Sequence, residues 1–182
     1  MIRLTALEIG ASPPDEFNVF VTVPAGARPY DVAIDDASGS LTVTKLYGSA
    51  MKTPGHIGVV PQTLHDDAPL KVIITDDHPL AAGMVIAARP LGVLYVSSDS
   101  SDEVTVLAVP AAALSTRHDV FDNYADLPGG QLREIAHFFM HYRDLELPRR
   151  NPSAGWGDVD EARRVIIEAM ENARAPLGLA DS

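Results

Sequence analysis

The chain has 182 residues, with 25 acidic and 14 basic side chains and a formal net charge of −11. Nucleic acids and anionic membranes are recognised through basic surfaces, so neither is expected as a partner. The absence of cysteine excludes disulfides, thiolate zinc sites and cysteine nucleophiles. The sequence has no signal-peptide pattern and no apolar stretch long enough to cross a membrane. We therefore expect a cytoplasmic protein with a single domain over residues 1–182 and a core of about residues 17–175.

The first two thirds of the chain is expected to form short strands separated by turns. Runs of apolar and β-branched residues, bounded by Pro, Gly or Ser/Asp clusters, occur at 19–23, 32–34, 41–43, 57–60, 72–75, 84–88, 92–96 and 104–109. The run 72–75 has no polar alternation, which predicts a strand buried on both faces. Many short strands at this spacing favour a closed barrel.

The last third of the chain has helical periodicity. Residues 131–142 carry apolar side chains three and four positions apart, and residues 126–130 precede them as a helix breaker. A second helix is expected to begin at Asp158, with Glu161 three positions later in a capping-box arrangement. Residues 175–182 are expected to be frayed. The fold class is therefore mainly β with α.

Several short motifs along the chain resemble those of a known family. They are Val23–Ala27, Ser49–Met51, Pro61–Leu64, Arg89–Leu94, Ala108–Pro110, Ile135–Phe139, His141–Glu146 and Gly155–Asp158. In order and spacing they are similar to the soluble inorganic pyrophosphatases of family I, from about residue 19 to residue 173. The resemblance implies a small five-stranded OB-like barrel with flanking helices, usually assembled as a hexamer in bacteria.

The family's chemistry uses several Mg²⁺ ions held by carboxylates, and its signature is an Asp-x-Asp-Pro-x-Asp run. The matching stretch here begins at Asp67, is one residue shorter, and has Lys71 at the position of the last aspartate. An ammonium group cannot ligate Mg²⁺ and repels it. The resemblance also places smaller or altered side chains in the family's pocket. The substrate-binding positions that it implies are Thr22, Asp31, Ala33, Thr53, Ile57, Asp67, Thr105 and Arg143.

These differences are interpreted as a retained pocket with a changed ligand and a degenerate metal and diphosphate site. The resulting hypothesis is a metal-independent enzyme without a cofactor, which has lost diphosphate hydrolysis and acts on a small organic molecule. The reaction would be a cyclisation, such as a [4+2] cycloaddition, or an isomerisation in natural-product biosynthesis. Lys71, Tyr142 and Lys45 are the predicted catalytic residues, with Lys71 in an internal ion pair with Asp67 or Asp31.

Two alternatives remain open at this point. One is a residual Mg²⁺-dependent inorganic pyrophosphatase, whose metal ligands would be Asp67, Asp99, Asp102 and Glu103. The other is a non-catalytic pseudoenzyme or binding protein. Outside the pocket, His137 and His141 are expected to pack on one helix face, and the pair Asp76–Asp77 is expected to be a solvated turn.

Overall fold

The computed structural model describes residues 4–35, 38–99, 101–146 and 150–175. Residues 176–182, within the segment expected to be frayed, lie outside these ranges. The strands are β1 (Phe17–Val23), β2 (Tyr30–Ile34), β3 (Leu41–Leu46), β4 (His56–Val59), β5 (Lys71–Ile74), β6 (Val85–Ser98), β7 (Ser101–Pro110) and β8 (Ser153–Gly157). The helices are α1 (Gly129–His141) and α2 (Val159–Arg174), and short 3-10 turns are η1 (Leu4–Ala6), η2 (Thr116–His118) and η3 (Tyr124–Asp126).

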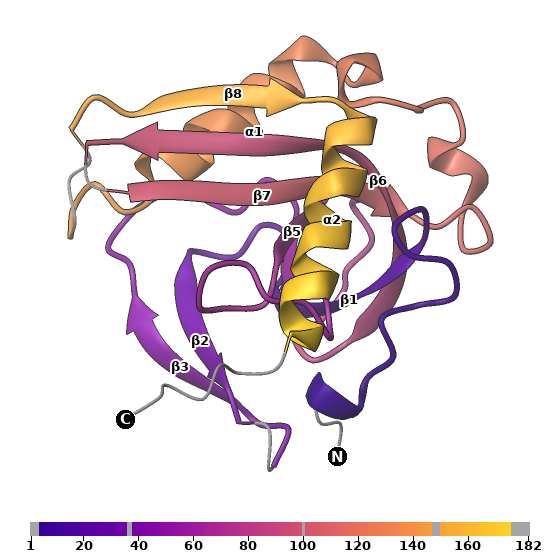
Figure 1. The fold of residues 1–182 in the computed structure, drawn as a ribbon. Helices are drawn as coiled ribbons and strands as arrows, with labels where there is room; N and C mark the ends of the chain where they lie inside the picture. Colours follow the sequence, from indigo (N-terminus) through magenta and orange to yellow (C-terminus); the bar gives the residue numbers. More distant parts are fainter. Residues whose placement is uncertain (1–3, 36–37, 100, 147–149, 176–182) are drawn as a thin grey trace.

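Five strands close into a ring, which confirms the predicted barrel with flanking helices. Their order is β1-β4-β5-β7-β6, and β1 pairs again with the beginning of β6, from Phe17 opposite Ala88 to Phe20 opposite Val85. Strand β8 pairs with the second half of β6, and the hairpin β2–β3 forms a separate two-stranded sheet (Figure 1). Closing the ring leaves few unpaired strand edges in this part of the fold.

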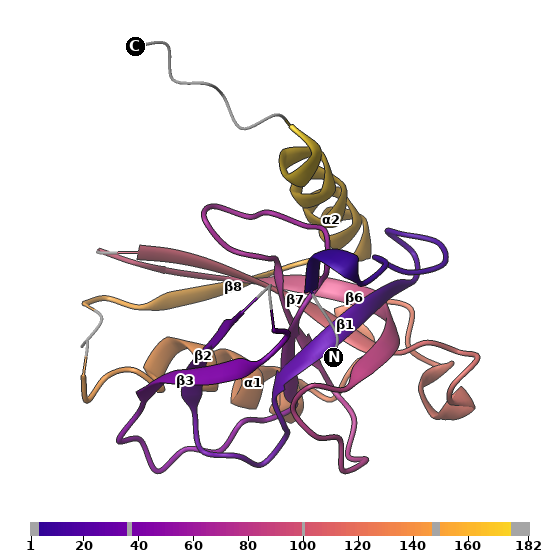
Figure 2. The same ribbon diagram turned by 90° about the horizontal axis from the view of Figure 1, so that it is seen from below.

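The two helices explain why the central strands are apolar on both faces. Val72 and Ile74 of β5 pack in the cluster that contains α2, whereas Ile73 packs in the cluster that contains α1. Figure 2 shows α1 and α2 on opposite sides of the long strands β6 and β7. The prediction that the run 72–75 is buried on both faces is confirmed, because each face is covered by a helix.

Strand β6 is longer than the two strands predicted for its region. It continues through Pro90, where its pairing with β7 shifts register between Pro90 and Gly92. A bulge of this kind accommodates a proline that cannot donate a ladder hydrogen bond. Strand β8 was not expected, since its sequence Ser-Ala-Gly-Trp-Gly has weak strand propensity. Pairing with the edge of β6 supplies the hydrogen bonds that make it a strand.

Helix α2 begins as the sequence predicts. The Asp158 carboxylate accepts a hydrogen bond from the Glu161 backbone N–H at 2.9 Å, which satisfies one of the free donors of the first turn. Helix α1 begins at Gly129, directly after Pro128, and buries Ile135 and Phe139 against the strands. In the described ranges, no helix has the length and apolar character needed to span a membrane.

Candidate active site

A cavity of about 520 Å³ lies between the β2–β3 hairpin, strands β1 and β4, and the end of α1. It collects side chains that are far apart in the sequence. Nine of the residues predicted for substrate binding or catalysis line it: Thr22, Asp31, Ala33, Thr53, Ile57, Asp67, Lys71, Tyr142 and Arg143. The structure therefore brings most of the predicted set together, while their roles remain predictions.

Two predicted residues do not line this cavity. Lys45 lies on β3 directly opposite Asp31, and its ammonium nitrogen is 5.2 Å from the centre of the Tyr47 ring. Thr105 is buried in β7. Glu103 precedes it by two positions, so the two side chains lie on the same face of the strand. Lys45 is thus adjacent to a pocket residue, and Thr105 belongs to the packed interior behind it.

Lys71 forms an ion pair with Glu103, with 2.5 Å between Nζ and Oε1. The side chains are 29% and 12% exposed. The pairing of β5 with β7 explains this contact. The strands are parallel with Val72 opposite Val106, so Lys71 lies level with Thr105 and shares a face with Glu103. The expected partners were Asp67 or Asp31. The structure corrects that prediction, because neighbouring strands carry Lys71 and Glu103.

Tyr47 does not line the cavity but contacts two residues that do, and the sequence reasoning missed it. Its hydroxyl donates a hydrogen bond to Asp31 Oδ2 at 2.5 Å. Burial, reinforced by this hydrogen bond to Asp31, raises the pKa of Tyr47 to about 12, so the phenol stays protonated. An aromatic residue two positions after Lys45, at the end of a largely exposed strand, was the available signal in the sequence.

Arg143 lies over two aromatic rings at the same end of the cavity. Its guanidinium carbon is 4.9 Å from the Tyr142 ring centre and 5.8 Å from that of Tyr47. Its Nε is buried and has no hydrogen-bond partner among the residues that the structure describes. Burial, together with the nearby charge of Glu103, raises the pKa of the Tyr142 hydroxyl. Arg143 is therefore a charged donor that lines the same cavity as Lys71, Asp31 and Asp67.

The carboxylates near this cavity do not fit a magnesium cluster. Asp31 accepts the Tyr47 hydroxyl, Glu103 is paired with Lys71, and Asp67 is exposed. Asp99 and Asp102 are exposed near the β6–β7 turn, where Asn151 donates to Asp99 at 3.2 Å. In the described parts of the chain, the only group of three possible ligands whose donor atoms lie within 4.8 Å of one another is Asp76, Asp77 and His78, outside this cavity. We therefore derive no chemical step through a metal ion.

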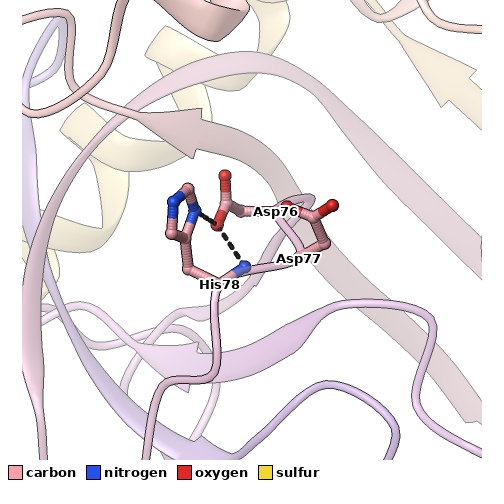
Figure 3. Close-up of side chains that lie close together, drawn as sticks. All are labelled: Asp76, Asp77 and His78. Atoms are coloured by element: carbon pink, nitrogen blue, oxygen red, sulfur yellow. Dashed lines mark hydrogen bonds and ion pairs between the residues drawn. The ribbon is translucent and has the colours of Figure 1, made fainter.

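That second cluster corrects the expectation of a solvated turn at Asp76–Asp77. The Asp76 side chain is 2% exposed and accepts hydrogen bonds from His78 Nδ1 at 2.6 Å and from His118 Nε2 at 2.8 Å. Figure 3 shows the Asp76 carboxylate directed at the His78 ring, while the Asp77 carboxylate points away from it. Asp77 is exposed as expected and pairs with Arg117. Asp77 is therefore solvated, whereas Asp76 is a buried carboxylate paired with two histidines.

The closed five-stranded ring, the two flanking helices and a cavity lined by ammonium, guanidinium and carboxylate groups define a small OB-like barrel protein with a charged pocket. Residues 19–174 match the family model described as inorganic pyrophosphatase. The chain belongs to this family, the soluble inorganic pyrophosphatases of family I.

Individual relatives match over nearly their whole length. The inorganic pyrophosphatase of Agrobacterium fabrum is 43% identical over 171 residues, which cover 93% of this chain and 97% of that protein. The inorganic pyrophosphatase of Brucella melitensis is 38% identical over 174 residues, covering 95% of this chain and 99% of that protein. The crystal structure of an inorganic phosphatase from Anaplasma phagocytophilum has a TM-score of 0.84 at 33% identity, covering 91% and 98% of the two chains.

These findings contradict the hypothesis of a cyclase or isomerase in natural-product biosynthesis. The relatives that match this chain across its length are inorganic pyrophosphatases, and nothing points to an organic metabolite. That hypothesis rested on Lys71 at the position of a metal-binding aspartate and on small neutral residues such as Thr22 and Ala33. The folded pocket is lined by the charged residues Asp31, Lys71 and Arg143 as well as by these small side chains, so it is not a purely apolar cavity.

Proposed function

We propose that this chain hydrolyses inorganic diphosphate to two phosphate ions. The observation that carries the proposal is the family match over residues 19–174, together with 43% identity to an inorganic pyrophosphatase over 93% of the chain. The pocket supports it, because Lys71 and Arg143 both line one cavity and both are donors for phosphate oxygens.

The hydrolysis requires positioning of the substrate and one proton transfer. The oxygen of a water molecule forms a bond to one phosphorus, the bridging P–O bond breaks, and the second phosphate leaves with the bridging oxygen. The water proton passes to a carboxylate, for which we propose Asp67, an exposed residue of the pocket lining. Arg143 and Lys71 stabilise the charge that develops on the phosphate oxygens.

Phosphate release from diphosphate with millimolar Mg²⁺ tests this function directly. Replacing Arg143 with Met removes the guanidinium from the pocket and is expected to lower kcat/KM about a hundredfold. Arg133→Met is the matched control: Arg133 is exposed on α1 and does not line the cavity, so its kcat/KM should stay near that of the unmodified chain. No phosphate release above background from the unmodified, folded chain would overturn the proposal.

We also propose that the protein acts in the cytoplasm as a homo-oligomer, a hexamer by family resemblance. Several large apolar side chains are exposed, among them Leu46 at 73%, Leu145 at 74% and Val120 at 75%. Exposed apolar side chains are frequent at subunit contacts. Sedimentation equilibrium gives the mass of the particle in solution, and a monomer at micromolar concentration would contradict this part of the proposal.

A further inference from the structure

We propose that Lys71 is a built-in counter-cation of the diphosphate site, neutralising Glu103 and binding phosphate oxygens where a divalent cation would otherwise be needed. This inference rests on the proposed function and concerns how the same pocket handles charge. The inference follows from the possible metal ligands near the cavity, because these carboxylates do not fit a magnesium cluster.

The first step of the argument is the position of the ammonium group. Lys71 lines the cavity, and its Nζ lies 2.5 Å from Glu103 Oε1. This contact occupies the carboxylate oxygen with a cation of the chain itself. A divalent ion would have to displace the ammonium to bind Oε1, and it would be repelled by the ammonium if it bound nearby. Glu103 is thus used as an anchor for Lys71.

The second step is the spare hydrogen-bonding capacity of the ammonium group. A lysine ammonium has three N–H donors, and one of them is directed to Glu103. The Lys71 side chain is 29% exposed and lines the cavity, so two N–H donors remain for a ligand bound there. An ammonium held by a carboxylate on one side and open to a pocket on the other is a fixed donor for an anionic ligand.

The third step is the second cation of the pocket. Arg143 has its buried Nε without a hydrogen-bond partner in the described part of the chain, and its guanidinium is held by the Tyr47 and Tyr142 rings. Burying a charged donor without an acceptor is costly, which points to an anionic ligand that completes its hydrogen bonds. Lys71 and Arg143 together place two cationic hydrogen-bond donors at one cavity.

The test is anion binding without divalent cations. Methylenediphosphonate, which cannot be hydrolysed at its bridge, is titrated into the full chain in EDTA by isothermal calorimetry. The unmodified protein should bind it, and Lys71→Met should weaken binding roughly tenfold or more, because a charge-assisted hydrogen bond is lost. Lys52→Met removes the same charge from an exposed lysine outside the cavity, and its affinity should stay within about twofold of the unmodified protein. Lys71→Gln is a second neutral variant should Lys71→Met not fold.

A second measurement examines metal binding itself. Lys71→Asp replaces the ammonium with a carboxylate beside Glu103, and we expect it to bind about one more Mn²⁺ per chain than the unmodified protein. Equal diphosphonate affinity for the unmodified chain and both neutral variants, or an unchanged number of Mn²⁺ ions in Lys71→Asp, would overturn the inference. If the unmodified chain still releases phosphate in that case, the proposed function stands without it.

Discussion

At the scale of single residues, Asp76 shows how a carboxylate can be buried and remain ionised. Burial alone would raise its pKa, but hydrogen bonds from His118 and His78 outweigh that effect and lower the pKa of Asp76 to about 2 (Figure 3). An unfolded aspartate titrates near 3.8. The ionised form is therefore favoured in the folded state, and this preference contributes to stability at neutral pH.

Replacing Asp76 with Asn removes that contribution. A folded-state pKa below the unfolded value stabilises the fold above about pH 4, and the stabilisation is lost as the pH falls from 4 towards 2. We expect Asp76→Asn to lower the free energy of unfolding by about 2 kcal/mol at pH 7, with a difference that shrinks below pH 4. Urea denaturation at pH 7, 5 and 3 measures it. Asp77→Asn changes the exposed neighbour and should have little effect on the free energy of unfolding. A loss of stability in Asp76→Asn that does not depend on pH would contradict this account.

At the scale of elements, β1 and β4 approach closely at Gly58. Gly58 lies opposite Val21 on β1 and Val72 on β5, so it is enclosed between two strands of the ring. A Cβ atom at this position would lie 2.5 Å from the Phe20 carbonyl oxygen and 2.6 Å from a Val19 methyl carbon. Only glycine permits this strand spacing at one side of the pocket.

Gly58→Ala is therefore expected to strain the ring. Moving β4 away from β1 would weaken their pairing, and we expect a loss of about 1–3 kcal/mol in the free energy of unfolding. Thermal unfolding followed by circular dichroism measures the change. Gly155→Ala on β8 is the matched control, since a Cβ atom there meets nothing within 4 Å. Equal melting temperatures for the two variants would show that the close approach has no energetic consequence.

At the scale of the whole molecule, β6 connects the parts of the fold. It pairs with β1, β7 and β8 and lies between the clusters packed by α1 and α2. Val93 belongs to the α2 cluster and Leu94 to the α1 cluster, so adjacent residues of one strand take part in both. Neither cluster can be lost without exposing part of the same strand, which predicts one cooperative unit over residues 17–175.

The single tryptophan makes this prediction measurable. Trp156 on β8 stacks on Tyr124 with ring centres 5.5 Å apart, and it packs at the edge of the α1 cluster. Its fluorescence reports that side of the molecule, whereas far-UV circular dichroism also follows α2. The two signals should give the same midpoint in guanidinium chloride. Separate midpoints would divide the chain into two folding units.

Local patterns in the sequence were sufficient for most of the strands, the two helices and the cap at Asp158. They were also sufficient for the family and for nine of the residues that line the pocket. These features depend on apolar periodicity, turn residues and short motifs, which act over a few neighbouring positions. Strand β8 could not be predicted in this way, because its hydrogen bonds come from β6 rather than from its own propensity.

The tertiary structure decided which charged groups meet. Lys71 and Glu103 are 32 residues apart, and the register of β5 against β7 brings them together. Tyr47 with Asp31, and Asp76 with His118, are likewise paired only by the fold. Substitutions considered one position at a time suggested a retained pocket with a changed ligand and a different reaction. The charge of a pocket is the sum over side chains from separate strands and a helix, and only their arrangement in space determines that sum.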